Sequence, residues 1–170
     1  MNKKQYKKIS DSIRKMVAED QCLRKSAEKS RDWKSVKEAD KKHTRLLKSI
    51  ISKHGWPTIQ DFGKEASEGA WLLAQHADHD LKFQERCLGM MNEAFDDKPE
   101  SVSRKYIAYL TDRVLVNSGK KQRFGTQFKR NTDGSLALYP VVNRNGVNRL
   151  RKQYGLESIS EYREIITLSP

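Results

Sequence analysis

The segment from Ala66 to Phe95 constrains the fold most, because it places polar residues inside a helical apolar pattern. At 100° per residue, its apolar side chains cover roughly half of the helical circumference, as in a helix that packs in a core. His76, Asp80 and Gln84 fall inside that arc, four residues apart. On one continuous helix they would line up along the interior face. Because buried polar groups need partners, this line predicts a functional site or a structural hydrogen-bond network.

The remaining pattern predicts an α+β fold that is predominantly α-helical. Asp80 can also act as an N-cap for a helix that starts at Leu81, so a break of the central helix at Asp80 is the alternative to a continuous one. Loop residues are expected around 54–63. The other expected elements are helices over 3–29, 34–53 and 102–116, a β-hairpin over 122–142 and short helices over 143–154 and after Ser158 or Ser160.

In the predicted hairpin, alternate side chains lie on opposite faces of each strand. One face is expected to carry Gln122, Phe124, Thr126 and Phe128, and the other Arg123 and Gln127. A glycine inside a strand indicates a β-bulge or a close approach by another backbone or a ligand, and Gly125 predicts one of these two features.

Charge is distributed unevenly along the 170 residues, whose formal net charge is +12. Residues 1–54 hold 17 Lys and Arg against 7 Asp and Glu, and residues 113–153 hold 10 against one. This contrast predicts a basic N-terminal helical hairpin over 1–54 that packs on a motif-bearing core over 55–170, within one domain overall. A basic surface attracts phosphate-bearing partners, although lysine-rich helix faces are often only solvated.

The composition also limits the compartment. No apolar run is long enough to span a bilayer, and the basic start lacks the apolar region of a secretory signal. Cys22 and Cys87 are too few and too isolated for a disulfide framework or a zinc site. We therefore expect a cytoplasmic protein with no membrane partner; the sequence does not indicate its oligomeric state.

Six different short motifs are spread along much of the chain: Asp20-Gln21 with Arg24, Gly55-Trp56-Pro57, Gln75-His76-Ala77-Asp78 with Asp80, Phe83-Gln84, Leu110-Thr111-Asp112-Arg113-Val114 and Gly125-Thr126-Gln127. Together they resemble a family of bacterial proteins known only as a domain of unknown function. The resemblance extends from about Val17 to Tyr162. Because the function of this family is unknown, the resemblance does not indicate an activity, and the cofactor is unknown. Relatives often have proline at the position of Leu81, which favours the break at Asp80.

The motif residues suit acid–base chemistry on an anionic ligand. His76, Asp80 and Asp112 are the candidate catalytic residues, because a carboxylate can orient an imidazole that ionises near neutral pH. Arg24 and Arg113 offer planar guanidinium groups for phosphate or carboxylate. The remaining candidate ligand-binding residues are the amides Gln21, Gln75, Gln84, Gln122 and Gln127. The leading hypothesis is a buried polar pocket of enzyme type for a nucleotide or another phosphate-containing or anionic small molecule.

Two other classes stay open, so the sequence does not decide whether the protein is an enzyme. Residues 113–153 interleave basic residues with Phe124, Phe128 and Tyr139, a composition typical of single-stranded nucleic-acid binding. The third class is a structural or protein-interaction domain, in which the polar motif is only a core network and the lysine-rich N-terminal hairpin is the interaction surface.

Other chemistries fit the sequence less well, and no metal is assigned. His76 with His79 or Asp80 has helical ligand spacing, but no further histidine pair completes a ligand set. Cys87 lies on an apolar face, which suppresses the reactivity of a thiol. Asp20 and Arg24 have the spacing of an ion pair along one helix, which by default lies on the surface.

Overall fold

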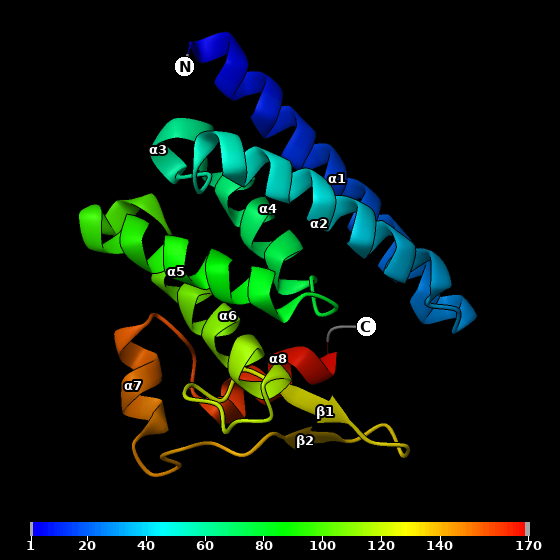
Figure 1. Ribbon diagram of the computed structural model, residues 1–170. Helices are drawn as coiled ribbons and strands as arrows, with labels where there is room; N and C mark the ends of the chain where they lie inside the picture. The colour runs from blue at the N-terminus through cyan, green and yellow to red at the C-terminus, as the bar shows by residue number, and fades with distance from the viewer. Residues whose placement is uncertain (1, 169–170) are drawn as a thin grey trace. The chain divides into compact units, whose positions relative to one another are not determined.

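The computed structural model describes residues 2–168, and its fold is α+β and predominantly helical, as predicted (Figure 1). Backbone contacts divide the chain into an N-terminal unit, up to residue 103, and a C-terminal unit, from residue 104. Residue 54, where the change in charge suggested a boundary, lies inside the N-terminal unit. None of the described helices combines the length and apolar character that a membrane-spanning helix requires.

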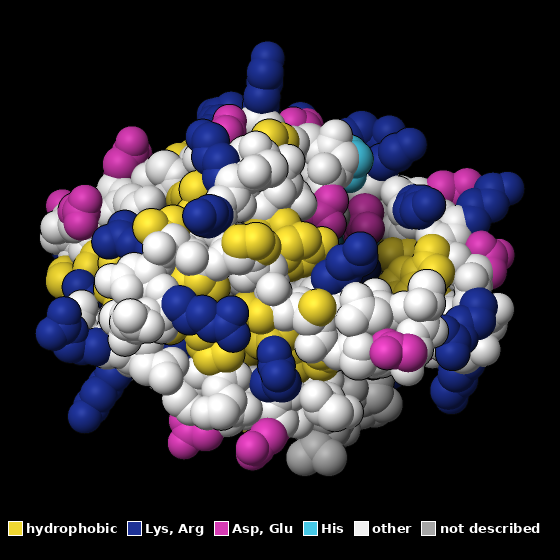
Figure 2. All heavy atoms as spheres, turned by 90° about the horizontal axis from the view of Figure 1, so that it is seen from below, with side chains coloured by type: hydrophobic (Ala, Val, Ile, Leu, Met, Phe, Trp, Pro, Cys, Tyr) yellow, Lys and Arg dark blue, Asp and Glu magenta, His cyan; other side chains and the backbone are white. Residues whose placement is uncertain are grey.

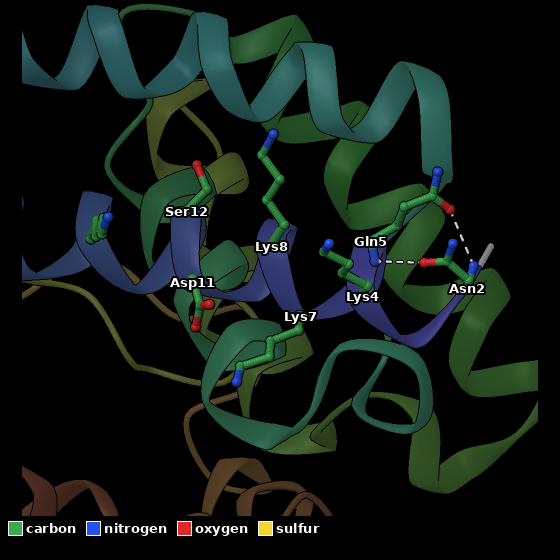
Figure 3. A pocket seen from close by; sticks show the side chains of 8 residues that line it. Asn2, Lys4, Gln5, Lys7, Lys8, Asp11 and Ser12 are labelled. Carbon is green, nitrogen blue, oxygen red and sulfur yellow. Dashed lines mark hydrogen bonds between the residues drawn. The ribbon is translucent and has the colours of Figure 1, made fainter.

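The N-terminal unit is built around a long helical hairpin. Helix α1 (Lys3–Ser30) starts at Asn2, whose side chain accepts a hydrogen bond from the backbone N–H of Gln5, while the Gln5 side chain accepts one from Asn2 (Figure 3). This capping box satisfies N–H groups that the first helical turn leaves unpaired. Helix α2 (Lys34–His54) runs back beside α1 (Figure 1).

Helix α4 (Lys64–Gln75) packs against both helices of the hairpin. Small residues on α4 allow this close approach. A Cβ atom on Gly69 would lie 2.9 Å from Val17 and 3.0 Å from Ile13, so a side chain there would push α1 away. The short helix α3 (Ile59–Phe62) precedes α4 and starts at the N-cap Thr58. The expectation of a continuous loop over 54–63 is wrong at this helical turn.

The central segment is broken, so the alternative with an N-cap at Asp80 is confirmed and the continuous helix is wrong. Helix α4 ends at Gln75, and helix α5 (Leu81–Asp97) starts after Asp80, whose carboxylate accepts the N–H of Phe83. The Gln84 side chain donates to the carbonyl oxygens of Ala74 and Gln75, the last residues of α4. Side-chain hydrogen bonds thus replace the helical ones across the break. The 3₁₀ helix η1 (Pro99–Ser101) follows α5.

The C-terminal unit consists of α6 (Arg104–Asn117), a two-stranded antiparallel hairpin of β1 (Phe128–Arg130) and β2 (Leu136–Leu138), and the helices α7 (Val147–Gln153) and α8 (Ile159–Leu168) (Figure 1). Its core contains Ala108, Phe124 and Leu156, with Tyr154 packed against them.

The predicted hairpin is too long, because residues 123–127 form a loop and Gln122 makes only an isolated parallel bridge to Val141. The Asp112 carboxylate accepts the backbone N–H groups of Arg123, Phe124 and Thr126, which therefore do not pair with a second strand. The predicted alternation of faces fails here: Phe124 and Gln127 are both buried. Gly125 has a φ of 70°, and a Cβ atom there would lie 2.7 Å from Cδ1 of Ile159. The groups that approach Gly125 are the side chains of Ile159 and Val141, so, within the part of the chain that the structure describes, neither the expected bulge nor an approach by another backbone or a ligand is found there.

Arg151 of α7 fixes the same loop through its carbonyl oxygens, whereas Asp112 binds its N–H groups. Its side chain is fully buried, and Nη1 donates to the carbonyl oxygens of Phe124 over 2.7 Å and Gly125 over 3.1 Å. Its Nε donates to the carbonyl oxygen of Glu157, in the turn before α8. A guanidinium with several fixed donors suits this role, because each buried carbonyl oxygen needs a partner.

Candidate functional site

Four side chains of the N-terminal unit meet beside the end of α4. Asp20 and Arg24 come from α1, Asp40 comes from α2, and His76 follows the last residue of α4. Nδ1 of His76 lies 3.1 Å from Oδ1 of Asp20, and Nε of Arg24 donates to the same oxygen over 3.0 Å. Nη2 of Arg24 donates to Oδ1 of Asp40 over 2.6 Å. We call these four residues the Asp20 cluster.

Asp20 is the buried centre of this cluster, with 1% of its surface exposed. Burial alone would raise the pKa of its carboxyl, but the hydrogen bond and charge of His76 and the charge of Arg24 outweigh burial and lower that pKa to about 2. Asp20 is therefore ionised at neutral pH. The Asp20–Arg24 pair is buried on one side and is not the surface ion pair that the spacing suggested by default.

Asp40 differs from Asp20, because burial raises the pKa of its carboxyl despite the opposing charge and hydrogen bond of Arg24. The two carboxyls share one guanidinium, and the negative charge of Asp20 also raises the pKa of Asp40. Two carboxyls with opposite pKa shifts within one cluster are typical of sites that transfer protons, although structural ion-pair networks also produce such shifts.

The contact with Asp20 fixes the tautomer of His76. An ionised carboxylate can only accept, so Nδ1 of His76 carries the shared proton and Nε2 of the neutral ring has the free lone pair. Nε2 makes no hydrogen bond to any described residue, and 16% of the side chain is exposed. The cluster thus presents an oriented imidazole with its basic nitrogen available for proton transfer.

The same cluster has three groups that could ligate a metal ion. One atom each from Asp20, Asp40 and His76 lies within 4.8 Å of the others. However, Arg24 already donates to both carboxylates, so a divalent cation between them would meet a positive guanidinium. The charge arrangement therefore favours a site without a metal. The carboxylates that could share a metal ion with His76 are Asp20 and Asp40, and not Asp80 or the His79 ring that the sequence suggested.

A profile of DUF6624, a family of unknown function, matches residues 6–168 of the chain. The chain belongs to this family. No curated protein and no solved structure matches it. The resemblance to a family of unknown function is therefore confirmed, whereas the bacterial origin of the family and its motifs stay predictions.

Two residues of the cluster, Asp20 and Asp40, were missing from the predicted site. Both lie within the apolar faces of their helices: Asp20 follows Met16 by four positions, and Asp40 follows Val36 by four and precedes His43 by three. The criterion that singled out His76, a polar residue inside an apolar arc, would have found both. The periodicity of the sequence does not indicate which helices pack together, so it could not show that these polar residues meet.

The other predicted residues of the N-terminal unit mostly take local roles. Gln21 donates to Oδ2 of Asp20 over 2.8 Å and so joins the edge of the Asp20 cluster. Asp80 caps α5 and pairs with Lys48, and Gln84 bridges α4 and α5. Oε1 of Gln75 is buried and has no hydrogen-bond partner among the described residues. Asp80 therefore does not orient His76, because Asp20 occupies Nδ1.

The predicted residues of the C-terminal unit form a second, separate network. Asp112 holds the loop before β1, and Gln122 extends this role by donating to the carbonyl oxygens of Gln127 and Tyr139 and accepting the N–H of Gln127. Nη1 of Arg113 donates to Oε1 of Gln127 over 3.1 Å. Burial raises the pKa of Asp112, and the hydrogen bonds from the loop N–H groups act against it. In this unit Asp112 and Gln122 substitute for strand pairing.

Cys87 and His43 lie outside these networks, and both are buried in the protein core. Burial raises the pKa of the Cys87 thiol to about 12, so this cysteine is a poor nucleophile at neutral pH, as its apolar face suggested. His43 is 1% exposed, and its Nε2 lies 3.1 Å from Oε2 of Glu19. It is a hydrogen-bonded core histidine of α2.

The lysine-rich face of α1 borders a surface hollow of about 640 Å³. Figure 3 shows Lys8 and Ser12 pointing to one side of the helix and Lys7 and Asp11 to the other. Lys4 and Lys15 also line this hollow. The row of lysines is the surface that a protein-interaction role would use.

The lowered pKa of Asp20 predicts how stability depends on pH. An aspartate carboxyl ordinarily has a pKa of 3.8, and that of Asp20 is about 2 in the folded protein, so its stabilisation is complete above pH 3.8 and is lost as the pH falls towards 2. We expect Asp20→Asn to lower the free energy of unfolding by about 2 kcal/mol at pH 7, with a difference from wild type that shrinks through this window. Urea denaturation at several pH values measures both quantities.

Asp97→Asn is the matched control, because Asp97 is exposed at the end of α5 and the change in charge is the same. We expect it to change stability by less than about 0.5 kcal/mol at pH 7. If Asp20→Asn differed from wild type equally at pH 7 and pH 2, the ionised carboxylate would not be the source of the stabilisation.

Proposed function

We propose that this DUF6624 protein is an enzyme in which His76 acts as general base and acid on a phosphate-containing or otherwise anionic small molecule. The observation that carries the proposal is the contact between Nδ1 of His76 and the ionised Asp20 carboxylate, which leaves Nε2 free. A buried carboxylate that holds one imidazole nitrogen, with the other nitrogen open to substrate, is a recurring arrangement for proton transfer.

The proposed reaction is hydrolysis. Nε2 of His76 removes a proton from a water molecule, and the water oxygen attacks the phosphorus or carbonyl carbon of the substrate. The bond to the leaving oxygen breaks, and the imidazolium returns its proton to that oxygen. Asp20 stays ionised throughout and stabilises the imidazolium, since its pKa lies far below neutral pH. The formal charge of +12 supports an anionic substrate.

The nucleic-acid alternative rests on its charge more than on its aromatic residues. Phe124 is 1% exposed and its ring centre lies 4.5 Å from that of Tyr154, so it is a core residue. Phe128 packs against Tyr162 and under Arg163. Base stacking needs an accessible aromatic face, which the buried Phe124 ring does not offer. Nucleic-acid binding by the basic residues of 113–153 stays a prediction.

The tautomer of His76 is the first test of the proposed function. In the protein labelled with ¹⁵N-histidine, we expect the neutral His76 ring to carry its proton on Nδ1, because Asp20 accepts it. Asp20→Asn should remove this preference, whereas Asp97→Asn should leave the ¹⁵N shifts unchanged. A neutral His76 ring with its proton on Nε2 in the wild-type protein would contradict the proposed function.

The second arm of this test looks for turnover of p-nitrophenyl phosphate, bis(p-nitrophenyl) phosphate and p-nitrophenyl acetate. We expect release of p-nitrophenol from a phosphate substrate, and no loss of rate when EDTA is added, because Arg24 supplies the positive charge in the cluster. Loss of the activity with EDTA would identify the cluster as a metal site. Turnover of none of the three substrates would favour the structural-network alternative, in which Asp20 and His76 only connect α1 to α4.

A further inference from the structure

A second concave surface lies within the C-terminal unit, along one side of α7. It has a volume of about 300 Å³, at the lower end of the range for small-molecule sites. Arg123 of the loop before β1 and Arg149 of α7 both line it, together with the amide side chains Asn143 and Gln153. We call this surface the α7 hollow.

The two arginines of the α7 hollow have no hydrogen-bond or ion-pair partner for their guanidinium groups in the part of the chain that the structure describes. The backbone N–H of Arg123 is bound by Asp112, but its guanidinium group only lies over the Phe124 ring, 5.5 Å from the ring centre. Neither this guanidinium nor that of Arg149 donates a hydrogen bond or forms an ion pair within the described residues. Both side chains are exposed, so their donors are available to a ligand.

No carboxylate balances this charge locally. The residues identified around the α7 hollow include no Asp or Glu, and the only acidic residue of 113–153 is Asp133 in the turn between β1 and β2. Two guanidinium groups around one hollow repel each other, and an anion between them would remove that cost. Guanidinium groups pair well with phosphate oxygens because their geometries match.

The same hollow offers apolar surface next to the positive charge. Val142 is 69% exposed, whereas Val147, which also lines the hollow, is only 3% exposed. Figure 2 shows hydrophobic side chains lying among Lys and Arg side chains on the face of the molecule seen from below. Oδ1 of Asn143 accepts the N–H of Gly146 over 2.9 Å, so the amide NH₂ group of Asn143 is left to donate.

We propose that the α7 hollow binds a small organic phosphate. The phosphate group pairs with Arg123 and Arg149, and the organic part lies on Val142 within reach of the Asn143 amide. This binding does not depend on the acid–base function proposed for His76. A small molecule fits better than a nucleic-acid strand, because the hollow has a volume of only about 300 Å³ and the nearby Phe124 ring is buried.

The test is calorimetric titration of the full chain with adenosine 5′-monophosphate, inorganic phosphate and adenosine. We expect the monophosphate to bind most tightly, inorganic phosphate to bind more weakly, and adenosine not to bind. Arg123→Ala and Arg149→Ala should each weaken binding of the monophosphate by about tenfold or more, since each removes charge-assisted hydrogen bonds to the phosphate oxygens.

Lys129→Ala is the matched control, because it removes one exposed positive charge from β1 of the same unit and Lys129 is not among the residues that line the hollow. We expect it to change the affinity by less than about twofold. His76→Gln should also leave binding intact, which separates this site from the Asp20 cluster. Thermal denaturation of each variant without ligand confirms that the arginine variants are folded.

Several results would overturn the proposal. Equal binding of adenosine and its monophosphate would show that no phosphate is recognised. An equal loss of affinity in Lys129→Ala would show that binding follows net charge and not the hollow. Binding of a single-stranded oligonucleotide alone, with the steep salt dependence that several phosphate contacts produce, would assign the basic residues to nucleic acid instead.

Discussion

Asp112→Asn should lower the free energy of unfolding by about 4 kcal/mol, the largest loss of stability that we expect from a single substitution in this protein. Oδ1 of Asp112 accepts the N–H groups of Arg123 over 2.7 Å and Phe124 over 3.0 Å. Oδ2 accepts the N–H of Thr126 over 2.9 Å and its hydroxyl over 3.0 Å. Every one of these partners is a donor, and Asp112 itself is fully buried.

An asparagine has nearly the same shape but only one acceptor oxygen. Whichever way its amide turns, the NH₂ group faces buried donors, so at least one backbone N–H loses its partner and a donor is forced against a donor. An unpaired buried donor costs about 1–3 kcal/mol, and the loop loses more than one bond. The loop also carries Phe124 into the core, so its displacement opens the apolar cluster around Ala108 and Leu156.

Urea denaturation measures the loss, and amide hydrogen exchange locates it. We expect the N–H groups of Phe124 and Thr126 to be protected from exchange in the wild-type protein and to exchange rapidly in Asp112→Asn. Asp133→Asn is the control: Asp133 accepts the N–H of Ser135 in the exposed hairpin turn, and its replacement should cost less than about 1 kcal/mol. A loss below about 1 kcal/mol in Asp112→Asn would mean that the carboxylate does not determine the loop.

This loop shows why the β-structure was predicted less well than the helices. Helical spacing is local, and the apolar periodicity of 3–29 and 34–53 was enough to place α1 and α2 to within about a residue. A strand, in contrast, depends on what its backbone pairs with. The alternation of 122–128 predicted a strand, but Asp112 and Gln122 supply the hydrogen bonds through their side chains. The alternation of residue types does not show that side chains compete with a second strand for these backbone hydrogen bonds.

The candidate site was predictable in part for a similar reason. Polar residues inside an apolar arc pointed to His76, and the spacing of four residues joined Asp20 to Arg24. The same spacing suggested Asp80 as the partner of His76. Because the helix breaks after Gln75, Asp80 instead caps the start of α5, and His76 contacts Asp20 of α1. The true partner lies 56 positions away in the sequence, and only the packing of α4 on α1 brings it close.

His76→Gln should reduce turnover of the phosphate substrate by 10²- to 10⁴-fold, the usual contribution of a general acid–base group. Glutamine keeps a polar side chain of similar reach but has no nitrogen that accepts a proton near neutral pH. His79→Gln is the control, because His79 is exposed in the same turn between α4 and α5. We expect this control to retain full activity, and thermal denaturation to show both variants folded.

The role of Asp20 separates a catalytic pair from a structural network. If Asp20 acts by orienting His76 and stabilising its imidazolium, Asp20→Asn should lower kcat with little change in KM, and the double variant with His76→Gln should be no slower than His76→Gln alone. Such non-additivity follows when one residue acts only through the other. If the losses of the two variants multiplied, or if both disappeared once the variants were stabilised at lower temperature, Asp20 and His76 would contribute to folding independently and the acid–base mechanism would be wrong.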